Sequence, residues 1–183
     1  MSSGPVTRIV VMGPPGSGKS TLARQLGDHL HLPVHHADAL FHGPGWVARP
    51  REDFITDMAA LAAQPAWVID SNYSSAHYGP AIHDRLARAD HIVVLDLPRR
   101  VTIPRILRRV ARHYGQVRPD SAAECPERLD LEFLIYCWNW GRAVRPQVLS
   151  VLEPIGERVI RYQQTPGLER VLADLESLGL HSG

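Results

Sequence analysis

The fold of this chain is decided by the stretch Gly13-Pro14-Pro15-Gly16-Ser17-Gly18-Lys19-Ser20-Thr21. It fits the phosphate-loop pattern G-x-x-x-x-G-K-[ST] in full. The β-branched apolar run Arg8–Met12 comes directly before it, and a helical pattern over Lys19–Leu30 follows, with leucines at every fourth position. Because this pattern requires a strand, a glycine-rich turn and a helix in that order, we interpret residues 13–21 as a phosphate-binding loop.

The residue types in this loop indicate which ligand it binds. Glycines let the backbone fold around phosphate groups with N–H groups pointing inward, and the following helix adds the positive end of its dipole. Lys19 is expected to reach the β- and γ-phosphates, and the Ser20 hydroxyl to ligate Mg²⁺. Lys19 is the single lysine among 20 Lys and Arg residues, and an ammonium is not interchangeable with a guanidinium among phosphates. Residues 13–21 therefore predict ATP and Mg²⁺ as cofactors.

The alternation of strand and helix patterns predicts the rest of the fold. Strand-like apolar runs occur at Arg8–Met12, Val34–His36, Trp67–Asp70, His91–Leu97 and Arg158–Tyr162. Helical patterns follow them at Lys19–Leu30, Arg51–Ala63, Ala76–Ala89 and Gly167–Leu178. This order is typical of an α/β domain, so we expect a P-loop NTPase fold with a doubly wound parallel sheet of about five strands.

One stretch, residues 99–152, breaks the alternation because it contains no convincing strand. It holds an arginine-rich helical pattern, a polar loop at Pro119–Pro126 and a long aromatic-rich helical pattern that begins at Glu127. A length of 183 residues points to a single domain. We expect its core at residues 6–98 and 153–180, and a helical lid region at residues 99–152.

Arginines are concentrated at the start of this region. Between Leu97 and Pro119 there are seven arginines and no acidic residue, namely Arg99, Arg100, Arg105, Arg108, Arg109, Arg112 and Arg118. Arg105, Arg109 and Arg112 recur at spacings of four and three, which places them on one helical face. A lid that carries arginines can stabilise a phosphoryl group in transfer and exclude water, so we predict catalytic roles for these three and for Lys19. A solvated basic face and a nucleic-acid patch remain open as alternatives.

Three acidic residues come at the ends of predicted strands. Asp38 follows Val34–His36, at the edge of the sheet where open α/β folds bind ligands. It could bind or deprotonate a substrate hydroxyl as a catalytic residue, or it could cap the next helix. Asp70 ends its strand where P-loop proteins commonly place a carboxylate near Mg²⁺, and we expect it to assist the metal. Asp96, at the end of the following strand, is the alternative for that role.

Composition limits the classes of protein and of partner. Lys+Arg 20 against Asp+Glu 19 gives a net charge of +1, so no overall field attracts nucleic acid or a membrane. No apolar run approaches the roughly 20 residues that span a bilayer. Two cysteines are too few for a disulfide framework, so we expect the protein in the cytoplasm. The N-K-x-D tetrapeptide of GTPases is absent. We expect a monomer or homodimer whose partner is a small-molecule phosphoryl acceptor.

Several segments together resemble a known family. The most specific are W-V-I-D-S-N-Y at residues 67–73 and C-P-E-R-L-D-L-E-F at residues 125–133. With the phosphate loop they resemble the topology modulation protein family of adenylate-kinase-like P-loop proteins, over residues 8–165. The resemblance implies the fold and chemistry of nucleotide and small-metabolite kinases. The family name refers to DNA supercoiling, so a regulator that binds ATP and has little kinase activity is the second hypothesis.

The resemblance also assigns residues to the two substrates. Asp96-Leu97-Pro98 followed by Arg105 and Arg109 is similar to an adenylate kinase pattern, which implies Arg105 near the ATP base and Arg109 near the phosphates. Adenylate kinases have Asp-Gly-Phe-Pro-Arg where this chain has Asp70-Ser71-Asn72-Tyr73-Ser74, so the arginine that would bind a monophosphate is missing. This leaves open a hydroxyl acceptor bound by Asp38, Asn72 and Tyr73. Arg51 could replace the lost charge.

Overall fold

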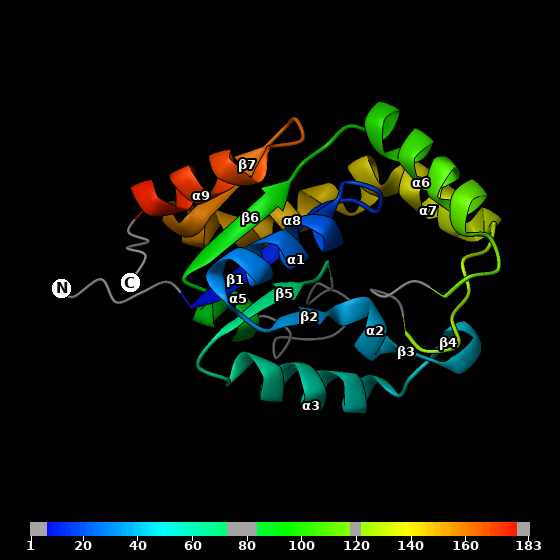
Figure 1. The fold of residues 1–183 in the computed structure, drawn as a ribbon, viewed down its shortest axis with the longest axis horizontal. Helices are drawn as coiled ribbons and strands as arrows, with labels where there is room; N and C mark the ends of the chain where they lie inside the picture. Colours follow the sequence, from blue (N-terminus) through cyan, green and yellow to red (C-terminus); the bar gives the residue numbers. More distant parts are fainter. Residues whose placement is uncertain (1–6, 73–83, 118–121, 179–183) are drawn as a thin grey trace.

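A five-stranded parallel sheet forms the centre of the protein. The computed structural model describes residues 7–72, 84–117 and 122–178. The strand order is β2-β5-β1-β6-β7, formed by Val34–His36, Trp67–Asp70, Arg8–Met12, His91–Leu95 and Val159–Tyr162. Helices cover both faces of the sheet (Figure 1). The prediction of an α/β fold with a doubly wound parallel sheet of about five strands is confirmed.

The central strand β1 shows why a strand in the middle of this sheet is almost entirely apolar. The helices on the sheet are α1 (Lys19–Leu30), α3 (Arg51–Ala62), α5 (Asp84–Arg88), α8 (Arg145–Leu152) and α9 (Leu168–Ser177). Ile9 and Val11 pack with α1 and α9, whereas Val10 and Met12 pack on the other face with α3, α5 and α8. All four side chains are at most 2% exposed. A strand that is buried on both faces needs apolar residues at every position.

Three helices occupy most of residues 99–152. They are α6 (Arg99–His113), α7 (Leu131–Ala143) and α8. The prediction that the aromatic-rich helix begins at Glu127 was wrong by about one turn. The Asp130 side chain accepts a hydrogen bond from the Phe133 N–H (3.0 Å) and caps α7 there. The Glu127 N–H instead donates to the Gln116 carbonyl (2.8 Å), so this residue lies in an extended segment that pairs with the chain after α6.

Further differences from the sequence predictions are confined to the ends of elements and to short elements. β6 ends at Leu95 rather than Leu97. Of the helix predicted at Ala76–Ala89, residues 84–89 are described, and the helix covers Asp84–Arg88. A short helix and a small antiparallel hairpin were not predicted; they are α2 (Ala37–Phe41), β3 (His42–Gly43) and β4 (Val47–Ala48). Within the described ranges, no helix has both the length and the apolar character needed to cross a membrane.

The hairpin at residues 42–48 is attached to the segment that precedes α7. The Gly45 N–H donates to the Glu124 carbonyl (3.0 Å), and Trp46 Nε1–H donates to the Pro126 carbonyl (2.9 Å). Figure 1 shows β3 and β4 at the same end of the molecule as α6 and α7. Two segments about 80 residues apart in the sequence therefore meet beyond the carboxyl ends of the strands, where they enclose the cavity described below.

Gly27 determines how closely α1 approaches β2. A Cβ atom at this position would lie 2.1 Å from Val34 Cγ2 and 2.9 Å from the Leu32 carbonyl oxygen. We expect Gly27→Ala to lower the free energy of unfolding by about 1–3 kcal/mol through overpacking, measured by urea denaturation. The matched control is Gly141→Ala in α7, where no atom lies within 4 Å of the new Cβ. Helix propensity alone makes that change stabilising by up to about 1 kcal/mol. Equal effects at both glycines would contradict the close contact between α1 at Gly27 and β2 at Val34.

Candidate active site

The phosphate loop packs tightly against the end of β6 and the start of α6. Gly13 and Gly16 have φ angles of 145° and 77°, which L side chains rarely adopt. A Cβ at Gly13 would lie 2.4 Å from the Leu95 carbonyl oxygen, and one at Gly16 would lie 2.7 Å from that of Thr102. Both glycines are therefore required for the loop to lie against the end of β6 and the start of α6.

Polar side chains from β5 and its continuation hold the loop from the other side. The Asn72 amide accepts a hydrogen bond from the Gly13 N–H (2.9 Å) and donates one to the Gly13 carbonyl. Ser20 Oγ donates to Asp70 Oδ2 (2.6 Å), and His36 Nδ1 lies 3.1 Å from the same oxygen. Asp70 is only 7% exposed. A hydroxyl and a carboxylate are thus adjacent at the start of α1, and such oxygen ligands suit Mg²⁺.

A cavity of about 680 Å³ opens over the loop, and we call it the loop cavity. Sequence reasoning singled out ten of its lining residues: Pro15, Gly16, Gly18, Lys19, Ser20, Thr21, Asp38, Asn72, Arg105 and Arg109. Lys19 lies over the loop, with its Nζ 3.3 Å from the Pro14 carbonyl oxygen. Asp38 lies in the first turn of α2. The sheet topology therefore brings phosphate-binding, acidic and arginine groups to one space.

The two lining arginines of α6 are both held by contacts. Arg105 donates to Thr165 Oγ1 (2.8 Å) and to the Ser17 carbonyl (3.4 Å), so it connects the phosphate loop with the segment before α9. Arg109 forms an ion pair with Glu127, with 3.1 Å between Nη2 and Oε1. Glu127 is only 5% exposed. These contacts fix both guanidinium groups on the loop-cavity side of α6.

Other predicted site residues have different positions. Arg51 and Arg112 are exposed and do not line the loop cavity. Arg51 begins α3, and Arg112 lies next to the last residue of α6, one turn beyond Arg109 on the same helical face. Asp70 lies behind the loop, where it accepts a hydrogen bond from Ser20, and the Asn72 amide is hydrogen bonded to Gly13 rather than left for an acceptor. Tyr73 lies outside the described residues.

Sequence reasoning missed the side of the loop cavity that faces the phosphate loop. Its residues come from the hairpin, from the segment before α7 and the first turns of that helix, and from the start of α8. They are His42, Trp46, Glu127, Arg128, Asp130, Phe133, Tyr136, Val144 and Gln147. The Arg128 guanidinium lies 6.0 Å from the centroid of the Trp46 ring and forms an ion pair with Asp130 (3.3 Å). The only signal in the sequence was the segment at residues 125–133, whose pattern did not show which residues face the cavity.

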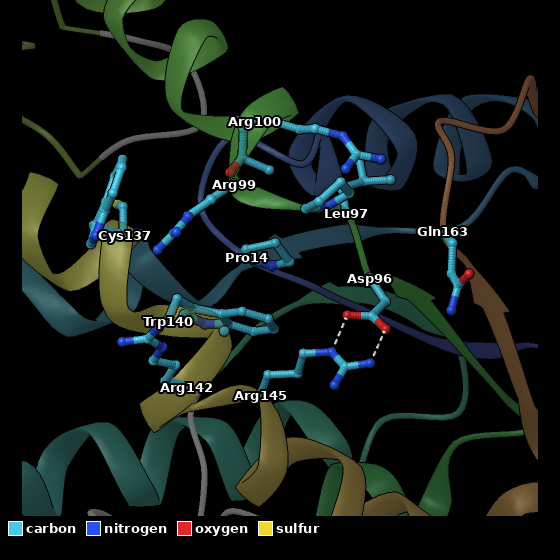
Figure 2. A pocket seen from close by; sticks show the side chains of 14 residues that line it. Pro14, Asp96, Leu97, Arg99, Arg100, Cys137, Trp140, Arg142, Arg145 and Gln163 are labelled. Carbon is cyan, nitrogen blue, oxygen red and sulfur yellow. Dashed lines mark hydrogen bonds and ion pairs between the residues drawn. The ribbon is translucent and has the colours of Figure 1, made fainter.

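Asp96, the alternative metal ligand, is engaged elsewhere. Arg145 contacts both of its carboxylate oxygens, at 2.7 and 2.9 Å (Figure 2). Arg161 contacts one of these oxygens at 2.9 Å. The hydrogen bonds to Asp96 raise the pKa of Arg145 above its usual value. Asp96 does not line the loop cavity. Its ion pairs with Arg145 and Arg161 connect the end of β6 to α8 and to β7, so Asp96 has a structural role.

We expect Asp96→Asn to lower the free energy of unfolding by about 1–3 kcal/mol, because it removes charge-assisted hydrogen bonds and leaves two guanidinium groups without a counter-charge. Urea denaturation measures this. The matched control is Asp57→Asn, which breaks the ion pair between Arg49 and Asp57, whose side chains are 34% and 41% exposed compared with 6% for Asp96. Exposed pairs contribute about 0–1 kcal/mol. A loss at Asp96 no larger than that at Asp57 would contradict the structural role.

Two titratable groups outside the loop cavity, His35 and Cys137, have pKa values shifted by burial. Burial, with a smaller contribution from the charge of His36, lowers the pKa of His35. Burial raises the pKa of the Cys137 thiol to about 11, which disfavours its reactive thiolate form. Among residues 7–72, 84–117 and 122–178, no group of three or more His, Cys, Asp or Glu side chains could hold a metal ion by itself.

Comparison with known proteins gives three informative matches. The chain is 31% identical to cytidylate kinase of Aeropyrum pernix over 130 residues, which are 65% of this chain and 72% of that protein. Its fold matches shikimate kinase of Aquifex aeolicus (TM-score 0.54, 16% identity, 93% and 96% of the two chains covered). It also matches a gluconokinase of Sinorhizobium meliloti (TM-score 0.54, 20% identity, 94% and 93% covered). No protein-family model matches the chain.

Proposed function

Because the chain belongs to the family of small P-loop kinases that includes cytidylate kinase, we propose that it transfers the γ-phosphoryl group of ATP to a small-molecule acceptor. The observation that carries this proposal is the composition of the loop cavity. Lys19 and Ser20 lie in the same cavity as Asp38 and as Arg105 and Arg109. A phosphoryl donor and an acceptor can therefore meet between phosphate-binding groups and an acidic group.

The donor side of the cavity fits ATP with Mg²⁺. Backbone N–H groups of the loop and the Lys19 ammonium would bind the phosphates. Mg²⁺ would be held by Ser20 with help from Asp70. The Asp70 carboxylate accepts a hydrogen bond from the Ser20 hydroxyl, with 2.6 Å between Oδ2 and Oγ. The metal would neutralise charge on the β- and γ-phosphates. Arg105, between Ser17 and Thr165, suits a position beside the nucleotide base.

The acceptor side is formed by Asp38 and by the residues facing the loop. Asp38 would accept the proton of an acceptor hydroxyl while the oxygen of that hydroxyl bonds to the γ-phosphorus of ATP. The bond between the γ-phosphorus and the β–γ bridging oxygen breaks at the same time, and ADP leaves with that oxygen. Trp46 and Arg128 line the same cavity and could contact the acceptor. Asn72 is assigned to supporting the loop, since its amide is hydrogen bonded to Gly13.

Residues 99–152 are proposed to act as the lid over a core of residues 6–98 and 153–180. Arg109 is the group best placed to respond to the substrate. Its guanidinium is paired with Glu127 at the edge of the loop cavity. A triphosphate carries more negative charge than one carboxylate, so Arg109 is expected to move toward the phosphates when ATP binds and to close the lid. Cys125 and Cys137 are both buried thiols, which fits a cytoplasmic setting.

The proposal is tested with ATP, Mg²⁺ and a panel of acceptors, following ADP release. The panel contains cytidylate and other nucleoside monophosphates, nucleosides, shikimate and gluconate. We expect at least one acceptor to raise ADP formation well above the rate without acceptor. Tight ATP binding with no acceptor-dependent ADP release would contradict the kinase and favour the second hypothesis, an ATP-binding regulator of DNA topology.

A further inference from the structure

A second cavity, of about 450 Å³, lies next to the loop cavity and shares no lining residue with it. It is bounded by Pro14 of the phosphate loop, by the start of α6 and by the junction of α7 and α8 (Figure 2). We call it the arginine cavity because four arginines line it: Arg99, Arg100, Arg142 and Arg145. None of these residues is needed for the reaction proposed above.

The charge of the arginine cavity is strongly positive. Asp96 is its single acidic lining residue, and its carboxylate is already bound by Arg145 and by Arg161. Within the described residues, Arg99, Arg100 and Arg142 form no ion pair. Three arginines beside one cavity thus lack a counter-charge from the described chain, and a bound anion would supply it.

Two features make the arginine cavity suitable for binding an anion. The Arg99 guanidinium lies 4.1 Å from the centroid of the Trp138 ring, a contact that holds the planar group in place and leaves its N–H edges able to donate. Arg99 and Arg100 also occupy the first turn of α6, which holds no acidic residue. The helix dipole disfavours cations at this end, so these arginines are unfavourably placed unless an anion lies beside them.

A buried polar group without a partner adds to this pattern. Trp140 lines the arginine cavity and is 3% exposed, and its Nε1–H is buried with no hydrogen-bond partner. We propose that the arginine cavity binds a phosphorylated small molecule, at a site separate from the ATP and acceptor positions. Arginine forks match phosphate oxygens, and the indole rings of Trp138 and Trp140 provide apolar walls for the rest of the ligand.

Pyrophosphate binding to the full-length chain tests this proposal. The experiment uses a Lys19→Ala background, in which the phosphate loop contributes less to binding. We expect isothermal titration calorimetry to detect a pyrophosphate site there, and Arg99→Gln with Arg142→Gln to weaken it at least about tenfold, since each lost charge-assisted bond weakens phosphate binding. The control is Arg108→Gln in the same background, which removes an exposed charge from α6 outside both cavities.

A second readout does not depend on the double variant folding well. Pyrophosphate that binds the N–H edges of the Arg99 guanidinium stacked on the Trp138 ring should change the tryptophan fluorescence, and this change should disappear in Trp138→Phe. The proposal is overturned if no pyrophosphate binds to the Lys19→Ala chain. It is also overturned if binding in the folded Arg99→Gln, Arg142→Gln variant equals that in the Arg108→Gln control.

Discussion

We expect Lys19→Ala to lower the acceptor-dependent phosphoryl transfer rate by about 10²–10³-fold, the loss typical of removing one preorganised group that stabilises transition-state charge. Lys19 lines the loop cavity and is folded over the loop, with its Nζ close to the Pro14 carbonyl. Its ammonium can therefore move to the phosphates without a change in the backbone. The measurement is the initial rate of ADP release with the best acceptor of the panel.

Two further variants show whether this loss is specific. Lys19→Arg keeps the charge, but a planar guanidinium does not fit where a compact ammonium contacts two phosphates, so we expect most of the loss to remain. Arg170→Ala removes an exposed charge on α9, far from the loop in sequence, and should leave the rate unchanged. If Lys19→Ala retained the wild-type rate, the loop would not be the phosphoryl-donor site.

We expect the second large effect from Asp38→Asn, which keeps the shape of the side chain but removes its capacity to accept a proton. Loss of a positioned general base lowers kcat by about 10²–10⁴-fold. The affinity for ATP should change little, because the loop and α1, rather than α2, are proposed to bind the phosphates. Steady-state kinetics and a separate ATP titration measure the two effects.

Asp53→Asn is the matched control for this substitution. Asp53 is exposed in the first turn of α3 and lines neither cavity. It should therefore keep the wild-type kcat. An Asp38→Asn variant with unchanged kcat would show that Asp38 serves only as an acidic residue in the first turn of α2, and a parallel loss of ATP affinity would point to a wider disturbance of the site.

The central sheet was predictable because each strand carries its own signal. Burial on both faces requires apolar residues throughout, as in Ile9 to Met12, and such runs can be identified without knowing their neighbours. The phosphate loop carries an equally local signal, since only glycine tolerates the backbone at Gly13 and Gly16. Both predictions rest on constraints that act within a few residues.

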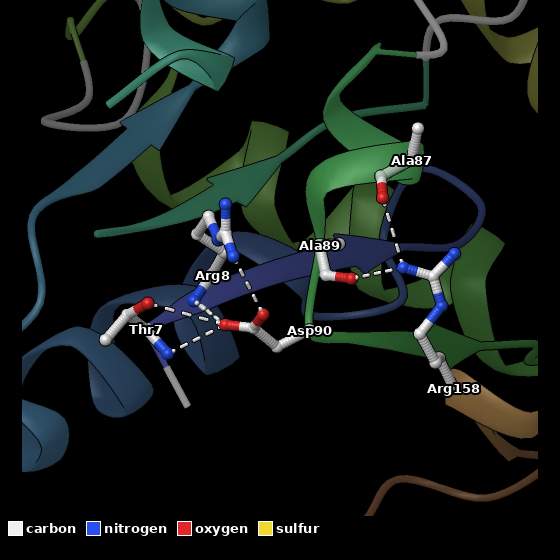
Figure 3. A network of polar contacts seen from close by, with 6 residues as sticks. All are labelled: Thr7, Arg8, Ala87, Ala89, Asp90 and Arg158. Carbon is white, nitrogen blue, oxygen red and sulfur yellow. Dashed lines mark hydrogen bonds and ion pairs between the residues drawn. The ribbon is translucent and has the colours of Figure 1, made fainter. Parts of the chain in front are cut away.

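Contacts between distant segments could not be predicted in this way. At the amino end of β1, Asp90 accepts hydrogen bonds from the Thr7 and Arg8 N–H groups (2.9 Å each), although 83 and 82 residues separate them (Figure 3). Arg158 donates to the Ala87 and Ala89 carbonyls in the same figure, at 3.2 and 2.6 Å. Nothing in the sequence near either partner indicates the pairing, because any exposed acid or arginine would look the same.

The same limit explains the incomplete prediction of the site. Arg51 has the charge suited to an anionic acceptor, but the start of α3 places it in solvent. Arg128, which does line the loop cavity, lies just before α7 and is brought there by the contact between Trp46 and Pro126. Charge and spacing alone could not distinguish these two arginines, since the difference lies in how the hairpin meets the segment before α7.

The fate of the γ-phosphoryl group tests the central claim most directly. ATP labelled in this group is incubated with Mg²⁺ and the best acceptor, and ADP, inorganic phosphate and phosphorylated acceptor are each quantified by mass spectrometry. The account predicts one phosphorylated acceptor for each ADP formed, with the rate of formation of both products about 10²–10³-fold lower in Lys19→Ala. Label that appears only as inorganic phosphate, or ATP that stays intact with every acceptor, would contradict it.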